Sequence, residues 1–142
     1  MISLDPQVIE IIEGARTIAV VGCSPNPHRD SYYSARYFMD QGYEVIPINP
    51  KHETILGARA YPDLLSAREA KGAIDIVNIY RASAYVVPHV EEAIQIQARL
   101  VWMQLGVVHE EAAELARAGG IAVVMNQCLR AKHKQLQRLE RT

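Results

Sequence analysis

The chain has 142 residues, of which 49% are hydrophobic and 22% charged, a composition typical of a globular protein. Lysine and arginine total 15 against 16 acidic residues, so net charge gives no reason to expect nucleic acid or an anionic membrane as partner. The longest apolar runs are far shorter than a membrane span, and the first residues lack the basic flank of a signal peptide. Cys23 and Cys128 stand in no metal-binding spacing. We therefore expect one domain over residues 1–142 in the cytoplasm, without a metal site.

Helical and strand patterns alternate along the whole chain. Asp5 and Pro6 form an N-cap followed by a first-turn proline, which predicts a helix ending at Gly14. The short runs that follow are almost wholly apolar, as in strands covered on both faces. The predicted strands are residues 18–21, 43–48, 74–80, 100–105 and 121–125, with an extended piece near 59–61. The predicted helices after the first are residues 31–41, 63–71, 87–98, 110–118 and 128–139.

This alternation predicts the fold class. Repeated strand–helix units of this length form a parallel sheet with right-handed crossovers and helices on both faces. We therefore expect a three-layer, Rossmann-like, doubly wound α/β fold with a five-stranded, mainly parallel sheet. The strand order expected is 3-2-1-4-5, and the sequence leaves the flavodoxin-like order 2-1-3-4-5 open.

The loop after the first predicted strand has the features of a phosphate site. In open parallel sheets ligands bind at the carboxyl ends of the strands, and phosphates lie at the first strand–helix junction. Gly22 permits a tight turn, Ser24 offers a hydroxyl, and Arg29 offers a fork of donors beside the helix start. The second and third glycines of the dinucleotide fingerprint are missing, which argues against ordinary NAD binding.

The end of the second strand separates two classes of nucleotide. NAD-binding domains place a carboxylate here to hold the ribose hydroxyls. This chain has Asn49, Pro50 and Lys51, with no carboxylate before Glu53. A lysine suits a ribose that carries a phosphate, which is either the 3′-phosphate of coenzyme A or the 2′-phosphate of NADP.

Several motifs in order resemble one known family. They are Val20-Val21-Gly22-Cys23-Ser24, Pro27-His28-Arg29-Asp30-Ser31, Gly42-Tyr43-Glu44-Val45-Ile46-Pro47-Ile48-Asn49-Pro50, Tyr61-Pro62-Asp63-Leu64, Asp75-Ile76-Val77-Asn78-Ile79-Tyr80-Arg81 and Val101-Trp102-Met103-Gln104-Leu105-Gly106. The chain resembles the small stand-alone CoA-binding domain proteins, relatives of the N-terminal domain of the succinyl-CoA synthetase alpha subunit. The resemblance implies contacts with the pantetheine-diphosphate part of CoA from Gly22, Cys23, Ser24, Arg29 and Ser31. It implies that Asn49, Pro50 and Lys51 approach the adenosine phosphate, and that Tyr80 and Arg81 line the cleft.

These observations favour binding over catalysis. The titratable residues follow no recognised spacing for a nucleophile and its base, so we name no catalytic residue. The expected function is non-catalytic binding of CoA or an acyl-CoA at the carboxyl ends of the strands. The alternatives are an NADP-linked oxidoreductase and a nucleotide-binding subunit of a larger acyl-CoA ligase complex. The expected partner is a small-molecule CoA ligand; a homo-oligomer and an acyl-CoA ligase partner stay open, as does whether Cys23 packs internally or meets the ligand.

Overall fold

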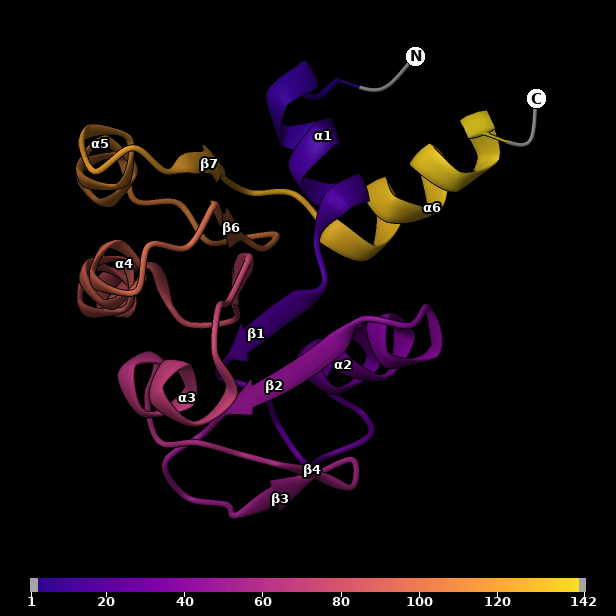
Figure 1. Cartoon of the computed structure of the whole chain (residues 1–142), viewed down its shortest axis with the longest axis vertical. Helices are drawn as coiled ribbons and strands as arrows, with labels where there is room; N and C mark the ends of the chain where they lie inside the picture. The colour runs from indigo at the N-terminus through magenta and orange to yellow at the C-terminus, as the bar shows by residue number, and fades with distance from the viewer. Residues whose placement is uncertain (1–2, 141–142) are drawn as a thin grey trace.

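Five parallel strands form the central sheet of the computed structural model, which describes residues 3–140 (Figure 1). The sheet strands are β1 (Thr17–Val21), β2 (Glu44–Ile48), β5 (Ile76–Ile79), β6 (Leu100–Met103) and β7 (Ala122–Val124). The helices are α1 (Pro6–Gly14), α2 (Asp30–Asp40), α3 (Leu64–Lys71), α4 (Val86–Gln95), α5 (Glu110–Ala118) and α6 (Leu129–Glu140). The three-layer Rossmann-like fold predicted from the sequence is confirmed.

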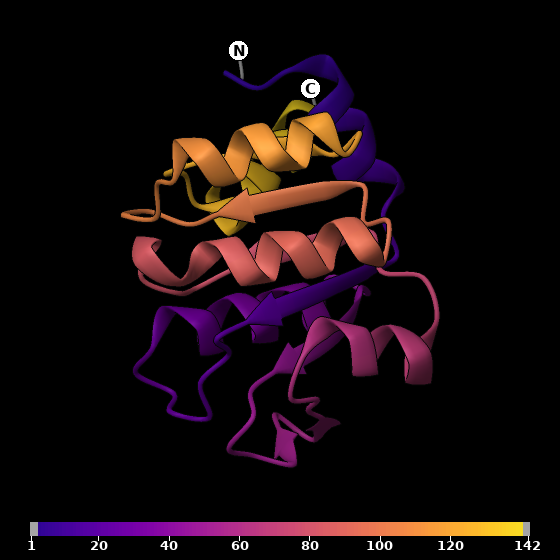
Figure 2. The same cartoon turned by 90° about the vertical axis from the view of Figure 1, so that its left-hand side faces the viewer.

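The helices divide between the two faces of the sheet. Helices α3, α4 and α5 cover one face, seen toward the viewer in Figure 2, and pack on strand residues such as Val77 and Val101. Helices α1, α2 and α6 cover the other face, where Phe38 and Trp102 are fully buried. Both faces are therefore closed to water, which explains why the strands read as continuous apolar runs.

The strand order consists of five full strands and a short bridge that lies outside β2. The five full strands lie in the order β2-β1-β5-β6-β7, so the strand predicted at 74–80 pairs with β1 and not outside β2. That outer place is taken by Tyr61, which forms a parallel bridge to Ile48. With this bridge counted as the third of six strands, the order is 3-2-1-4-5-6, which contains the predicted 3-2-1-4-5 pattern of dinucleotide-binding folds. The assignment of residues 74–80 as its third strand is corrected, because the backbone of Tyr61 already occupies the hydrogen-bonding edge of β2.

Most predicted boundaries agree with the structure to within a few residues. Asp5 caps α1 through a hydrogen bond from the Gln7 amide (2.8 Å), and Asp63 caps α3 in the same way (2.8 Å from Ser66 N). Two features differ. The helix predicted at 87–98 ends earlier, at Gln95, and a short 3-10 turn η1 (Ser83–Tyr85) precedes it. A small hairpin of β3 (Thr54–Ile55) and β4 (Ala58–Arg59) occupies a segment expected to be mainly loop.

The last helix folds back onto α2 and contributes to the site described below. His133 of α6 is 6% exposed, and its Nδ1 lies 2.7 Å from the Tyr37 hydroxyl. The same imidazole meets Phe38 and Tyr43 edge-on, with ring centroids 5.4 and 5.6 Å apart. Within residues 3–140, none of the helices is both long enough and apolar enough to cross a bilayer.

Candidate functional site

A groove of about 1040 Å³ runs along the carboxyl edge of the sheet. Each strand of the sheet ends at this edge, so loops far apart in the sequence come together there. Its lining residues are Gly22, Ser24, His28, Arg29, Asp30, Ser31, Lys51, Tyr80, Arg81, Gln104, Leu105, Val107, Cys128 and Arg130. Seven of the ten site residues expected from the sequence therefore line one groove, and Cys23, Asn49 and Pro50 do not.

The loop between β1 and α2 is held by its own polar side chains. The Ser24 amide donates to Ser31 Oγ (2.9 Å), and the Asn26 amide donates to Ser24 Oγ (3.0 Å). A serine oxygen that accepts an amide still has its own O–H to donate. Ser24 and Ser31 thus shape the loop, and both line the groove.

The start of α2 carries positive charge toward the groove. Its N-cap position is Arg29, whose side chain makes no capping hydrogen bond. The amides of the first turn are therefore without the side-chain acceptor that Asp5 gives α1. Free amides, the helix dipole and an exposed guanidinium together favour an anion at this point.

Four cations from different loops reach the groove. They are Arg29 after β1, Lys51 after β2, Arg81 after β5 and Arg130 in the first turn of α6, and the lining holds one carboxylate, Asp30. Within residues 3–140, no carboxylate oxygen lies within 4.0 Å of any of the four. An aqueous groove with this excess of positive charge attracts a polyanion.

The loop after β2 connects the groove to a neighbouring hollow. Asn49 Nδ2 donates to the Cys23 carbonyl (2.9 Å) and Asn49 Oδ1 accepts from the Lys51 amide (2.8 Å), so this side chain ties the two loops together. Lys51 lines both the groove and the adjacent hollow of about 680 Å³, which Asn49 and Pro50 also line. Asn49 thus holds the two loops together, and Lys51 stands where the two cavities meet.

The floor of the groove contains a buried polar chain that the sequence did not reveal. Gln104 is 5% exposed and donates through Nε2 to Asn78 Oδ1 at 2.5 Å, and Asn78 Nδ2 donates to Ser34 Oγ at 3.3 Å. Burial raises the pKa of Tyr80 to about 12, so its phenol stays neutral beside them. Gln104 and Cys128 follow β6 and β7, so the strand-end rule could have found them, although the sequence analysis did not assign them. Arg130 lies within α6, and its place at the groove depends on how that helix packs.

Comparison with known proteins places the chain in a family. Residues 16–134 match the family model described as CoA binding domain. The chain belongs to the CoA-binding domain family. The curated protein YneT of Bacillus subtilis is 37% identical over 127 residues, covering 89% of this chain and 92% of YneT.

Solved structures agree with the fold of this CoA-binding domain. A hypothetical protein from Pyrococcus horikoshii superposes with a TM-score of 0.87 at 32% identity, covering 96% of this chain and 99% of that one. A dinucleotide-forming acetyl-coenzyme A synthetase of Ca. Korarchaeum cryptofilum superposes with a TM-score of 0.70 at 21% identity, covering 82% of this chain and 27% of the synthetase. At that identity the second likeness concerns the fold.

The two cysteines of the CoA-binding domain differ in accessibility. Cys23 is 0% exposed among Val20, Phe38 and their neighbours, and burial raises its pKa to about 12. Cys128 is partly exposed and lines the groove. The sequence left open whether Cys23 packs internally or meets a ligand, and in the structure its side chain packs internally.

We expect iodoacetamide at pH 8 to alkylate Cys128 in the folded protein and to leave Cys23 unmodified. The thiolate is the reactive form, and a buried thiol with a pKa of about 12 supplies almost none of it. Peptide mass spectrometry after a timed reaction measures both sites. Urea-unfolded protein is the control, in which both cysteines should react, and rapid native labelling of Cys23 would contradict the burial.

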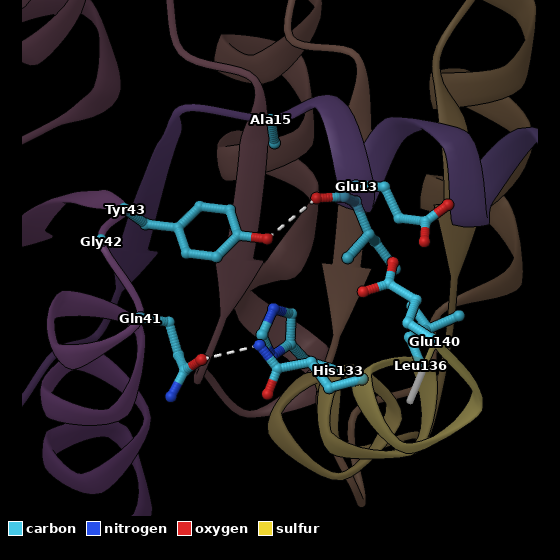
Figure 3. A pocket seen from close by; sticks show the side chains of 10 residues that line it. Glu13, Ala15, Gln41, Gly42, Tyr43, His133, Leu136 and Glu140 are labelled. Atoms are coloured by element: carbon cyan, nitrogen blue, oxygen red, sulfur yellow. Dashed lines mark hydrogen bonds between the residues drawn. The ribbon is translucent and has the colours of Figure 1, made fainter. Parts of the chain in front are cut away.

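A second hollow lies at the opposite edge of the sheet, where α1, the turn before β2 and α6 meet (Figure 3). It has about 310 Å³, and Tyr43 bonds across it to the carbonyl of Ile12 (2.9 Å). A hydrogen bond from Glu140 raises the pKa of Glu13, since the two carboxyl groups share this space. An acidic hollow at the amino edge of the strands is a poor site for a phosphate-bearing ligand.

Proposed function

We propose that this chain binds coenzyme A or an acyl-CoA in the groove at the carboxyl edge of the sheet. The observation that carries the proposal is the convergence of Arg29, Lys51, Arg81 and Arg130 on one groove with a single carboxylate. CoA is a polyanion with a diphosphate and a 3′-phosphate, and it has the charge that such a groove attracts. Membership of the CoA-binding domain family supports the same ligand.

The positive groups of the groove suggest where each phosphate of CoA binds. The diphosphate lies at the start of α2, beside Arg29 and the hydroxyls of Ser24 and Ser31, because helix amides and a guanidinium fork favour it there. The 3′-phosphate lies at Lys51, which stands between the groove and the hollow lined by Asn49 and Pro50.

The proposed role is binding without turnover. Half of the eight ionisable side chains that line the groove are arginine or lysine, which hold phosphates and stay protonated at neutral pH. Incubation with acetyl-CoA and assay for free thiol tests this part. A steady release of CoA that depends on the protein would overturn the non-catalytic role and leave the binding proposal intact.

Calorimetric titration with CoA, dephospho-CoA, NAD and NADP tests the binding proposal. We expect CoA to bind about tenfold more tightly than dephospho-CoA, since a charge-assisted contact to a phosphate contributes about 1.5 kcal/mol. Lys51→Gln should remove that preference, whereas Lys134→Gln, on α6 and outside the groove, should keep it.

Each other result has a definite meaning. Absence of CoA binding would end the proposal, and tighter binding of NADP than of CoA would favour the NADP-linked alternative. Equal affinities for CoA and dephospho-CoA would show that Lys51 does not hold the 3′-phosphate. Raising the salt concentration should weaken CoA binding, because the attraction is largely electrostatic.

A further inference from the structure

Helices α2 and α6 lie side by side and begin at the same groove. Three pairs of side chains join them, and from one pair to the next both partners come later in the sequence. The pairs are Tyr33 with Arg130, Tyr37 with Lys134, and Gln41 with Gln137. Contacts in this order mean that the two helices run parallel, with their amino ends together. Asp30 of α2 and Arg130 of α6 accordingly both line the groove.

Tyr80, which follows β5, locates Arg130 at the α2 side of the groove. Burial contributes most to the raised pKa of its phenol, and charges from both helices act on it as well. Asp30 of α2 raises this pKa, and Arg130 of α6 lowers it. Such effects weaken with distance, so both charges lie near the same phenol. Arg130 therefore belongs to the part of the groove where α2 begins.

The side chain of Arg130 is held at this point without being neutralised. Its guanidinium carbon lies 5.9 Å from the centre of the Tyr33 ring, a distance typical of a cation–π contact. Tyr33 stands in the first turn of α2. Across residues 3–140 no carboxylate oxygen lies within 4.0 Å of Arg130. A guanidinium that stacks on a ring keeps the N–H donors at its edge for another partner.

The start of α2 by itself offers a diphosphate little net positive charge from side chains. Arg29 is the N-cap residue, but the next residue, Asp30, is the one carboxylate in the groove lining. Arg81 places its guanidinium carbon 5.1 Å from the ring centre of Tyr85 in η1, the turn before α4, which covers the other face of the sheet. Each phosphate of a diphosphate carries negative charge, so a second cation at α2 strengthens its binding. Arg130 supplies that cation.

We infer that Arg130 of α6 binds the diphosphate of CoA together with Arg29, so that both helices form this part of the site. This inference rests on the proposed function, since it needs CoA in the groove with its diphosphate at the start of α2. The planar guanidinium of Arg130 presents paired N–H donors, which match the oxygens of a phosphate. The family model described as CoA binding domain matches residues 16–134, and this range includes the first turn of α6.

CoA and dephospho-CoA separate a contact with the diphosphate from a contact with the 3′-phosphate. Both ligands carry the diphosphate, and only CoA carries the 3′-phosphate. We expect Arg130→Gln to weaken the binding of both by the same factor, about tenfold, because each loses one charge-assisted contact. The ratio of the two affinities should then keep its wild-type value, whereas Lys51→Gln should weaken CoA alone. Calorimetric titration at low salt measures all four affinities.

Further variants distinguish a bound phosphate from a structural role of Arg130. Arg130→Lys should recover part of the lost affinity, because lysine keeps the charge but not the paired donors. Lys134→Gln is the matched control: Lys134 lies over the Tyr37 ring (5.3 Å) one turn later and does not line the groove, so both affinities should change less than about twofold. The urea midpoint of Arg130→Gln should match that of the wild type, since this side chain is only partly buried.

The possible results separate the inference from the proposed function. Unchanged affinities in Arg130→Gln would overturn the inference and leave CoA binding standing. Weaker binding of CoA alone would place Arg130 at the 3′-phosphate and would overturn the inference as well. An equal loss in Lys134→Gln, or a lowered urea midpoint in Arg130→Gln without recovery in Arg130→Lys, would reject a direct contact. Failure of the wild-type protein to bind either ligand would overturn the proposed function itself.

Discussion

Gly22→Ala should lower the free energy of unfolding by about 3 kcal/mol and weaken CoA binding by more than about tenfold. Gly22 has a φ of +79°, a conformation that strains any residue with a Cβ, and a Cβ there would collide with the backbone carbonyl of Tyr80. The carbonyl belongs to the strand end beside β1 and cannot move as a flexible side chain would. The loop must shift instead, and with it the amides and hydroxyls proposed to hold the diphosphate. Urea unfolding followed through the single Trp102 and calorimetry with CoA measure the two effects.

Gly57→Ala is the matched control. Gly57 also has a positive φ, +75°, but no heavy atom lies within 4 Å of the place where its Cβ would be. Only the conformational strain remains, so the free energy of unfolding should fall by about 1 kcal/mol with CoA affinity unchanged. Equal effects of the two substitutions would show that the contact with Tyr80 does not constrain the loop.

The sequence predicted the regular elements well because their local signals agree with their packing. Asp5 and Pro6 start α1 where expected, and the residues of α5 are those predicted. The β3–β4 hairpin was missed for a local reason. Its turn places Leu56 and Gly57 at φ values of 54° and 75°, and a leucine at a positive φ gives none of the Asn-Gly signal typical of such turns.

The candidate site was predictable wherever it depends on the rule that ligands lie after strands. That rule found Gly22, Arg29 and Lys51, which line the groove. It could not tell that the Cys23 side chain points into the core, because the neighbouring residues Gly22 and Ser24 of the same loop are partly exposed. Nor could it place Arg130, whose position depends on how α6 docks on α2 through His133 and its aromatic neighbours. Such long-range packing leaves no local pattern in the sequence.

Asn78→Leu should destabilise the fold by about 3 kcal/mol and reduce CoA affinity several-fold. Asn78 is 0% exposed and joins Gln104 of the groove floor to Ser34 of α2. Leucine of similar size removes both hydrogen bonds and leaves the buried Gln104 amide without its acceptor, the costly case for a polar group. Freed from Asn78, Gln104 also loses its fixed orientation toward the groove. Urea unfolding and calorimetry with CoA report the two consequences.

The double variant Asn78→Leu with Gln104→Leu tests whether the cost of Asn78→Leu comes from the buried Gln104 amide that it leaves without an acceptor. Replacing both partners by apolar groups removes the unsatisfied amide, so the double variant should be at least about 1 kcal/mol more stable than Asn78→Leu alone. Gln137→Leu, which breaks the exposed bond from Nε2 to Gln41 Oε1 (2.8 Å), should change stability by less than about 0.5 kcal/mol. Strict additivity of the two buried substitutions would mean that Asn78 and Gln104 do not act as a pair. Coupling between the two substitutions would show that the Asn78 amide, buried in the sheet, contributes to stability through the same hydrogen bond that orients Gln104 in the groove floor.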